Sequence, residues 1–363
     1  MTYSMTPGRR GLDSSRVDAD VEHLDVAVVG GGQAGLALGY HLTRRGTRYA
    51  IFDAASEIGH SWRSRWESLT LFTPAQFSCL PGLRFPAPDD HYPSKDEVAQ
   101  YLQLYANTFE LPVRPATAVL GLSRTTDGFV LETNAGLVSA ERVVVATGPF
   151  QQPAVPSFAS DLPAGVLQVH SAHYVHPEQL PPGDVLVVGG GNSGFQVASE
   201  LAATRTVYLS VGRRLIHLPQ RLLGRDLFWW LTRLGVMRVE GASPLGRFFR
   251  TQTDAVVGTP SRRLSERGVE IVPRAVGVRG DAVVFADGRT KSFPVVVWAT
   301  GYHMEYRWLR VPVLDQAGRP MHRAGFTPVP GLFFLGLPWQ RTAGSALLGF
   351  VGRDARSIAE RLT

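Results

Sequence analysis

The sequence predicts an α/β fold with two mainly parallel sheets, each built around one strand, turn and helix. Near residue 30 and again near residue 190, an apolar run leads directly into a glycine-rich turn and a segment with helical spacing. Each unit is followed by an apolar strand that ends in Ala-Thr-Gly, over 143–148 and 295–301. Strands that alternate with helices in this order form parallel sheets. The repetition predicts two domains of one kind rather than a single continuous sheet.

The first unit has the features of a Rossmann-like dinucleotide-binding site. A strand is predicted over 24–29, a helix over 34–45 and a second strand over 49–52, with Asp53 at its end. Gly30 allows a tight turn, Gly32 lets the backbone approach a pyrophosphate, and Gly35 lets helix and strand pack closely. Asp53 can accept a hydrogen bond from a ribose hydroxyl. The predicted cofactor contacts of this turn are Gly30, Gly32, Gln33, Ala34 and Gly35.

The second unit repeats this order over 184–210 but ends differently. Its predicted contacts are Gly189, Gly191, Asn192, Ser193 and Gly194. No acidic residue closes the second strand, and the chain continues instead into Arg213 and Arg214. Guanidinium groups pair with the 2′-phosphate of NADPH, which a carboxylate would repel. The pattern therefore favours NADPH over NADH, and the alternative is that the two arginines form only a solvent-exposed turn.

Composition agrees with a globular enzyme. The 363 residues are 44% hydrophobic and 19% charged, and the net charge is +6. The basic residues are dispersed and no nucleic-acid motif accompanies them, so we expect no nucleic-acid partner. No apolar run approaches the roughly 18 residues of a spanning helix, so we expect a cytoplasmic protein without membrane contact and with a flexible tail over 1–23.

Cysteine usage limits the redox chemistry. Cys79 is the only cysteine of the chain. One thiol cannot build a disulfide framework, a cysteine-based zinc site or a dithiol pair within one chain. His170, His173 and His176 lack neighbouring carboxylate ligands, and we assign no metal site to them.

Further motifs lie outside the two glycine turns. They are Gly59-His60-Ser61-Trp62-Arg63, the stretch 69–77, Leu80-Pro81-Gly82, Tyr92-Pro93-Ser94-Lys95-Asp96-Glu97 and His170-Ser171-Ala172-His173-Tyr174. Ser94 and Glu97 form a capping box for a predicted helix that extends to Tyr105. With these motifs the chain resembles the flavin-containing monooxygenases, which are class B flavoprotein monooxygenases. The similarity is greatest to bacterial relatives of the plant flavin monooxygenases of auxin synthesis.

The resemblance implies two Rossmann-like domains and their cofactors. Residues 24–155 and 300–363 would bind FAD, and an inserted domain over 156–299, with an insertion near 220–250, would bind NADPH. Further FAD contacts implied by the resemblance are Ser61, Trp62, Arg63, Val119, Thr147, Gly148, Ser345 and Leu347. The corresponding NADPH contacts are Ser171, Thr300 and Gly301.

The resemblance also implies the reaction. NADPH would reduce the flavin, O₂ would add at flavin C4a, and the hydroperoxide would pass one oxygen atom to a small organic substrate. Because the cofactor carries this chemistry, no catalytic side chain is assigned. In many family members an asparagine faces the flavin where this chain has Phe72. The role of that asparagine is therefore not carried over.

Several alternatives stay open from the sequence alone. The chain is also compatible with an NADPH-dependent flavin reductase or oxidase that does not oxygenate a substrate, or with a non-catalytic flavin-binding redox sensor. The segment 222–249 interleaves aromatic residues with arginines and predicts either a lid or membrane contact, or an insertion packed on the NADPH domain. We favour the insertion. The substrate and the oligomeric state stay open, a homodimer included.

Overall fold

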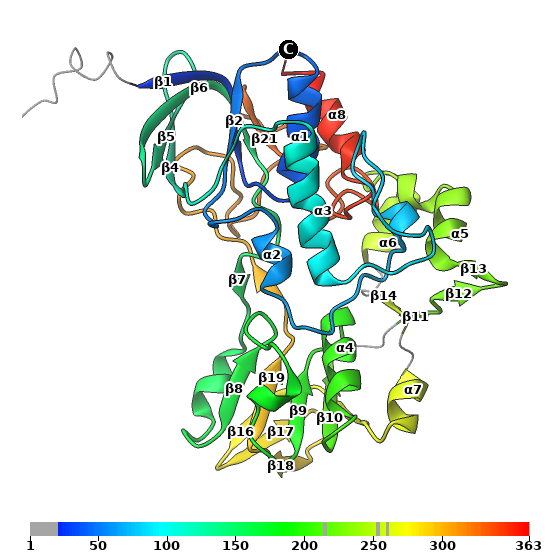
Figure 1. The fold of residues 1–363 in the computed structure, drawn as a ribbon. Helices are drawn as coiled ribbons and strands as arrows, with labels where there is room; N and C mark the ends of the chain where they lie inside the picture. The colour runs from blue at the N-terminus through cyan, green and yellow to red at the C-terminus, as the bar shows by residue number, and fades with distance from the viewer. Residues whose placement is uncertain (1–20, 213–215, 252–254, 259–260, 363) are drawn as a thin grey trace, which may run out of the picture.

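The computed structural model describes residues 21–212, 216–251, 255–258 and 261–362. These residues form two α/β bodies joined by a narrow connection (Figure 1). The predicted fold class, α/β with two Rossmann-like domains, is confirmed. Within the described residues, no helix combines the length and the apolar character needed to cross a bilayer.

The first body contains a seven-stranded sheet in the order β3-β2-β1-β6-β5-β4, with β21 also paired to β6. Strands β3, β2, β1, β6 and β21 pair in parallel, whereas β4, β5 and β6 form antiparallel hairpins. The strands are β1 (Glu22–Val29), β2 (Tyr49–Phe52), β3 (Val113–Arg114), β4 (Val119–Arg124), β5 (Phe129–Thr133), β6 (Gly136–Val145) and β21 (Leu332–Phe334). Because β21 returns to β6, the C-terminal segment completes the sheet that the N-terminal segment begins.

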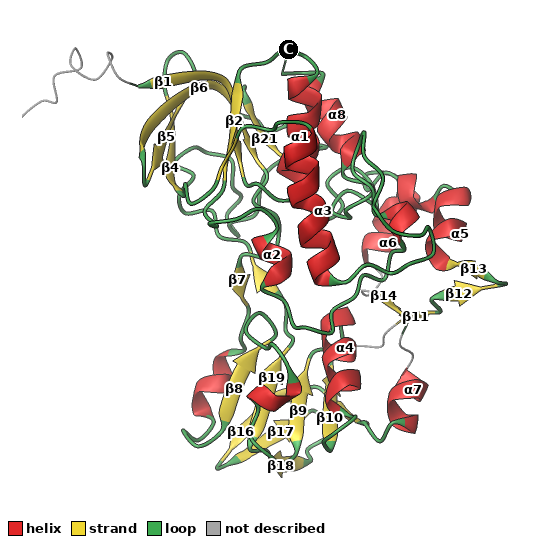
Figure 2. Ribbon diagram, in the orientation of Figure 1, coloured by secondary structure: helices red, strands yellow, loops and turns green. Residues whose placement is uncertain are grey.

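Helices cover one face of this sheet (Figure 2). They are α1 (Gln33–Thr43), α3 (Lys95–Thr108) and α8 (Gly352–Ala359), and their apolar faces share one core with β1 and β2. Val26 to Val29 are buried on both sides, as expected for a central parallel strand. The predicted capping box is present, because Ser94 Oγ accepts from Glu97 N and the Glu97 carboxylate accepts from Ser94 N.

The second body contains a five-stranded sheet in the order β15-β10-β9-β19-β8, parallel throughout. Its strands are β8 (Leu167–His170), β9 (Val185–Val188), β10 (Val207–Val211), β15 (Glu270–Pro273) and β19 (Val295–Trp298). Helices α4 (Asn192–Leu201) and α7 (Ser261–Glu266) accompany it, together with a hairpin sheet of β16 (Ala275–Arg279), β17 (Ala282–Phe285) and β18 (Thr290–Ser292). The predicted turn at 287–288 joins β17 to β18.

Two short strands connect the bodies. β7 (Gln152–Pro153) leaves the first body and pairs antiparallel with β20 (Tyr302–His303), which returns to it. Ala154 N also donates to the carbonyl of Gly301 at 2.9 Å. These two crossings of the chain therefore run side by side, and we call them the connector.

The expected flexible tail over 1–23 needs a correction at its end. Residues 1–20 lie outside the described part, but Glu22 and His23 belong to β1 and pair with Val138 and Ser139 of β6. The Glu22 carboxylate also forms an ion pair with Arg114 of β3. Strand β6 is long enough to pair with β1 beyond the apolar core, so the polar residues Glu22 and His23 still belong to β1.

The interpretation of 222–249 as an insertion packed on the NADPH domain is wrong. This segment contains β12 (Arg221–Leu222), β13 (Arg225–Asp226), α5 (Leu227–Arg233) and α6 (Pro244–Thr251), and it lies beside the first body (Figure 1). Tyr92 Oη donates to Asp226 at 2.7 Å, and Gln220 Nε2 donates to the Phe72 carbonyl at 2.9 Å. The buried Asp226 carboxylate thus accepts from Tyr92 on the first body, and Gln220 of the insertion donates to the first body at Phe72, which fixes where the insertion packs.

The remaining short elements complete the fold. They are α2 (His60–Arg63), β11 (Ile216–Leu218), β14 (Ala255–Val257), and the 3₁₀ turns η2 (Ala75–Phe77), η3 (Ser157–Asp161), η4 (Pro177–Gln179) and η5 (Val236–Arg238).

Candidate nucleotide sites and active site

The turn between β1 and α1 is shaped by glycines that cannot be replaced without a clash. A Cβ atom at Gly30 would lie 2.5 Å from the carbonyl oxygen of Ala146, and Gly30 has a φ of 112°. A Cβ atom at Gly35 would lie 2.0 Å from the carbonyl oxygen of Gly30. The turn is therefore held tightly between its own helix and the end of β6, as the sequence predicts.

Gly32 differs from its neighbours. It is the N-cap of α1, and a Cβ atom there would meet nothing within 4 Å. The space beside Gly32 is thus open at the helix N-terminus, where unpaired backbone N–H groups favour an anion. This geometry fits the pyrophosphate of a dinucleotide, because a side chain at Gly32 would fill space that the protein itself leaves open.

The turn between β9 and α4 repeats this arrangement. Cβ atoms at Gly189 and Gly194 would lie 2.1 Å from the Ala299 carbonyl oxygen and 1.9 Å from the Gly189 carbonyl oxygen, whereas Gly191 meets nothing within 4 Å. Asn192 Oδ1 accepts from Val257 N at 3.0 Å, which ties the helix start to β14. Ser193 follows in the first turn of α4. The second turn therefore fits a second pyrophosphate in the same way.

Asp53 lies at the end of β2, beside the first turn. Its Oδ2 atom accepts from Gly31 N at 2.6 Å, and its Oδ1 atom accepts from Ala55 N at 2.8 Å. The carboxylate therefore organises the turn backbone, a function that the sequence did not reveal. Each oxygen has a second lone pair, so these bonds leave acceptor capacity for a ribose hydroxyl.

The C-terminal loop returns to the first turn. Gln33 Nε2 donates to the Ala346 carbonyl at 3.0 Å, and Ser345 Oγ, fully buried, accepts from the backbone N–H groups of Arg341 and Thr342. Leu347 lies in the same loop, and its N–H donates to the Gly344 carbonyl. The structure thus brings predicted FAD contacts more than 300 residues apart into one neighbourhood.

A polar and aromatic cluster lies at the connector between the bodies. Arg65 hydrogen-bonds to Tyr302 Oη, and its guanidinium group lies 5.1 Å from the Tyr302 ring centroid and 5.7 Å from that of Phe150. The Tyr302 ring meets the His170 imidazole edge-on at 5.1 Å. The cluster therefore links the first body to both strands of the connector and to the end of β8.

The protonation state of His170 follows from its partners. Ala172 N donates to Nδ1 at 3.1 Å, so the ring proton is on Nε2, which donates to the Gly301 carbonyl at 3.0 Å. Burial lowers the pKa of His170, the hydrogen bond to Gly301 raises it, and the charges of His173 and Arg65 lower it further. A neutral His170 fits this position and holds Gly301, a predicted NADPH contact.

Other predicted contacts fall at the strand ends. Thr147 and Gly148 follow β6, and Gln151 Nε2 donates to Thr147 Oγ1 at 3.0 Å and to the Gly148 carbonyl at 2.7 Å. Thr300 Oγ1 donates to the Ala154 carbonyl, and Ser171 follows β8 with only 2% of its surface exposed. These residues surround the connector.

Ser61, Trp62 and Arg63 lie in α2, which packs on α3. Lys95 Nζ donates to the Arg63 carbonyl at 3.1 Å, and the Arg63 side chain pairs with Glu57 at 3.2 Å. Val119 is the first residue of β4. The FAD contacts of α2 and of Val119 stay predictions, as do the nucleotide contacts of the two glycine turns. Arg213 and Arg214 lie outside the described residues.

The insertion covers Phe72. The rings of Phe72 and Phe228 stack with centroids 5.8 Å apart and planes inclined by 21°. Asp226 caps α5 by accepting from Phe228 N at 2.6 Å, and it also accepts from Gln220 Nε2 at 2.8 Å. Desolvation and the Asp226 carboxylate raise the pKa of Tyr92 to about 12, so its hydroxyl stays a donor. The sequence did not reveal the hydrogen bond between Tyr92 and Asp226, because these two residues lie 134 positions apart.

The described residues contain no cluster of three or more His, Cys, Asp or Glu side chains that could hold a metal ion. Cys79 is partly exposed, and its Sγ donates to the Ala75 carbonyl at 3.3 Å. Two dinucleotide-type turns, one on a mixed sheet and one on a parallel sheet, with a connector between them, define a protein that binds two dinucleotides.

Comparison with known proteins identifies the family. Residues 27–217 match the family described as pyridine nucleotide-disulphide oxidoreductase, and the chain belongs to it. The chain is 46% identical to an oxidoreductase of Geobacillus kaustophilus named CzcO-like, over 93% of this chain and 98% of the relative. It is 27% identical to the indole-3-pyruvate monooxygenase YUCCA4 of rice, over 96% of this chain and 90% of that protein.

Solved structures agree with this assignment. A flavin-containing monooxygenase from Stenotrophomonas maltophilia has a TM-score of 0.81 and 29% identity, over 94% of this chain and 98% of that one. The predicted membership in the class B flavoprotein monooxygenases is thereby confirmed. At the level of the family, the expected cofactors FAD and NADPH are also confirmed.

Proposed function

We propose that the chain is an NADPH- and O₂-dependent monooxygenase that transfers one oxygen atom to a small organic substrate. FAD binds at the turn 30–35, and NADPH binds at the turn 189–194. The observation that carries this proposal is the shared steric pattern of the two turns. In each, two glycines are required by the fold, and a third leaves open space at a helix N-terminus.

The residues of the chain bind and orient the two nucleotides. Bound FAD supplies the hydride acceptor and the centre at which O₂ is activated. The N–H groups at the starts of α1 and α4 receive the two pyrophosphates, and Asp53 receives a ribose hydroxyl. Gln33 fastens the loop that contains Ser345 and Leu347 over the first turn. Arg213 and Arg214 select the 2′-phosphate of NADPH.

The connector sets how the two nucleotides face each other. Hydride transfer requires the nicotinamide and the flavin within near contact, so the relative position of the two bodies decides the rate. Arg65, Tyr302 and His170 join both bodies at the connector. We assign these three residues a positioning role.

The insertion excludes water from the reacting side. The resemblance places position 72 at the flavin, and the stacked rings of Phe72 and Phe228 close this side with apolar surface. Exclusion of water protects a reactive intermediate from wasteful decay. Asp226 holds this cover in place through Tyr92 and Gln220.

Disulfide reduction is the activity that the family description suggests besides oxygenation. A flavoprotein disulfide reductase needs two thiols that exchange electrons with the flavin. Cys79 is the only cysteine of the sequence. The dithiol form of that activity therefore does not fit one chain.

Isotope labelling tests the proposal. Purified FAD-loaded protein is supplied with NADPH, ¹⁸O₂ and a panel of amines, thioethers, ketones and aryl 2-oxo acids, and the products are analysed by mass spectrometry. We expect one ¹⁸O atom in the product of at least one class. NADPH oxidation that yields only hydrogen peroxide with every class would contradict oxygenation and support the oxidase alternative.

A further inference from the structure

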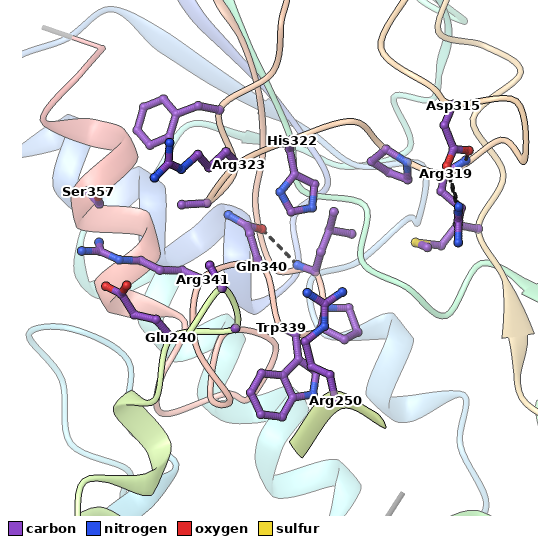
Figure 3. A pocket seen from close by; sticks show the side chains of 18 of the residues that line it. Glu240, Arg250, Asp315, Arg319, His322, Arg323, Trp339, Gln340, Arg341 and Ser357 are labelled. Carbon is purple, nitrogen blue, oxygen red and sulfur yellow. Dashed lines mark hydrogen bonds and ion pairs between the residues drawn. The ribbon is translucent and has the colours of Figure 1, made fainter. Parts of the chain in front are cut away.

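A cavity of about 760 Å³ lies in the first body, outside the two nucleotide turns (Figure 3). Its walls come from the insertion, from the loop 315–326, from the loop after β21 and from α8. No residue predicted above to contact FAD or NADPH lines it. The function proposed above does not use this cavity.

Arginines dominate the lining. They are Arg250, Arg319, Arg323, Arg341 and Arg361, and we call this space the arginine-lined cavity. Glu240 and Asp315 are the acidic residues of its lining, and Asp315 is engaged with Arg319 at 2.8 Å. Within the described part of the chain, no carboxylate lies within ion-pair distance of the other four guanidinium groups. Glu240 contributes one negative charge to the lining against these four guanidinium groups, so a bound anion would add negative charge where positive charge is in excess.

His322 adds a neutral donor. Gly325 N donates to its Nδ1 at 3.3 Å, which leaves the proton on Nε2. Burial and the charge of Arg250 lower the pKa of His322. In the view of Figure 3 its imidazole and the guanidinium group of Arg250 point toward each other. His322 Nε2 and the Arg250 guanidinium group are both hydrogen-bond donors, and an anion binds to donors.

The backbone of the lining is unusual. Trp339 and Ala324 adopt φ values of 55° and 54°, and together with Glu110, Ala116 and Leu223 they are the non-glycine residues with positive φ in the described chain. Such conformations persist where surrounding structure enforces them and cluster at ligand sites. Gln340 supports the floor of the cavity by donating to the Phe334 carbonyl at 2.9 Å. Trp339 and Phe326 add aromatic surface to the lining.

The cavity lies where the insertion meets the C-terminal loop. Gly241 N donates to the Arg341 carbonyl at 2.8 Å, so the insertion and the C-terminal loop meet at its edge. Gly336 lies against Ala34 of the first glycine turn, because a Cβ atom at Gly336 would be 2.8 Å from the Cβ of Ala34. The next residue, Leu337, lines the cavity. One loop therefore separates the cavity from the predicted FAD turn.

We propose that the arginine-lined cavity binds a small organic anion that carries a carboxylate or phosphate group. Arg250, Arg323, Arg341 and Arg361 receive the anionic group, and the aromatic surface of Trp339 and Phe326 receives the rest of the molecule. The ligand joins the insertion to the C-terminal loop. This site is additional to the nucleotide sites and to the reacting side near Phe72.

Calorimetric titration tests the site on the full chain. FAD-loaded protein in saturating NADP⁺, which keeps both nucleotide sites filled, is titrated at about 0.15 M ionic strength with phenyl phosphate, benzoate and neutral benzyl alcohol. We expect one anion per chain and no binding of the alcohol. Binding of phenyl phosphate alone or benzoate alone would support the site and identify the anionic group of its ligand.

Matched variants locate the binding. Arg323→Gln combined with Arg361→Gln should weaken anion binding about tenfold or more, because charge-assisted hydrogen bonds are lost. Arg356→Gln removes the same charge from α8 outside the cavity and should leave binding unchanged. Flavin absorbance and thermal melting confirm that each variant is folded, and Arg361→Gln alone serves if the double variant loses FAD. Absence of anion binding to the unmodified protein, or equal binding to the cavity variants and Arg356→Gln, would overturn the proposal.

Discussion

Gly32 and Gly191 occupy matching positions in the two turns, and neither glycine is needed for the fold itself. Both face open space, so Gly32→Asp and Gly191→Asp should leave the apoprotein folded, with an unchanged circular dichroism spectrum. Gly32→Asp places a carboxylate against the FAD pyrophosphate and should abolish flavin binding. Gly191→Asp should stay yellow and lose NADPH binding. The flavin content of the purified protein and titration with NADPH measure both effects.

The paired outcome makes this prediction specific. If Gly32→Asp purifies with stoichiometric FAD, the first turn is not the FAD site. If Gly191→Asp loses FAD while Gly32→Asp retains it, the two assignments are reversed.

Cofactor choice rests on Arg213 and Arg214. Replacing both residues by Ala should raise the KM for NADPH with little effect on NADH, because only NADPH carries the 2′-phosphate. A charge-assisted contact is worth about 1.5–3 kcal/mol, so the preference should fall about tenfold or more. Steady-state kinetics with both nucleotides gives the ratio of efficiencies. A ratio equal to that of the unmodified protein would mean that the arginines form only a solvent-exposed turn.

At the scale of residues, the two turns were predictable because their requirements are local in sequence. Gly30 precedes α1 and Gly35 lies in its first turn, and a Cβ atom at Gly35 would clash with the Gly30 carbonyl oxygen. The connector cluster was not predictable in this way. Arg65 and Tyr302 lie 237 residues apart, and only the folded chain brings them together.

At the scale of elements, the insertion depends on one buried carboxylate. Asp226→Ala removes the α5 cap, leaves the Tyr92 hydroxyl without its acceptor and removes one of the two acceptors of Gln220 Nε2, at a cost of about 2–4 kcal/mol. We expect faster proteolysis within 221–251 and a larger share of NADPH consumption ending as hydrogen peroxide. Limited proteolysis and a peroxide assay measure these effects.

A surface variant provides the control for this prediction. Asp127 is exposed in the turn between β4 and β5, and Asp127→Ala should leave both quantities unchanged. Equal proteolysis of the Asp226 and Asp127 variants would show that Asp226 does not hold the insertion.

The position of the insertion shows where sequence reasoning reaches its limit. Its aromatic residues and arginines indicated an accessory segment, but composition does not identify the surface on which a segment packs. The stacking of Phe228 on Phe72 joins parts of the chain that no periodicity connects. The capping box at Ser94 was predictable because both of its partners lie within four residues.

At the scale of the whole molecule, buried and partly buried histidines make stability depend on pH. Burial lowers the pKa of His41, His170, His217 and His322. The unfolded chain therefore binds more protons than the folded chain as pH falls below about 6.5, and stability decreases there. Burial raises the pKa of Asp354, which acts in the opposite direction as its carboxyl titrates.

Thermal unfolding of the FAD-loaded protein between pH 7.5 and pH 5.5 tests this dependence. We expect the melting temperature to fall toward acid and the slope to be smaller in His170→Gln. This variant removes one titrating group and leaves the others in place. A slope that His170→Gln does not change would show that His170 does not contribute to the acid sensitivity.

The division into two bodies was predictable from the repeated turns, and their relative arrangement was not. The Ala-Thr-Gly strand ends placed Thr147 and Thr300 near the crossings between the bodies, since each follows a central parallel strand. The arginine-lined cavity gave no signal in the sequence, because its arginines come from four separate segments. The placement of FAD on 24–155 and 300–363 and of NADPH on 156–299 stays a proposal.

Anaerobic mixing of the FAD-loaded protein with NADPH tests most directly whether the two turns act together as one enzyme. Flavin absorbance near 450 nm is followed in a stopped-flow instrument without any substrate. We expect complete bleaching with NADPH, slower bleaching with NADH, and none in Gly191→Asp at the same nucleotide concentration. A flavin that stays oxidised in the unmodified protein with saturating NADPH would contradict a hydride-transferring enzyme and favour a flavin-binding sensor.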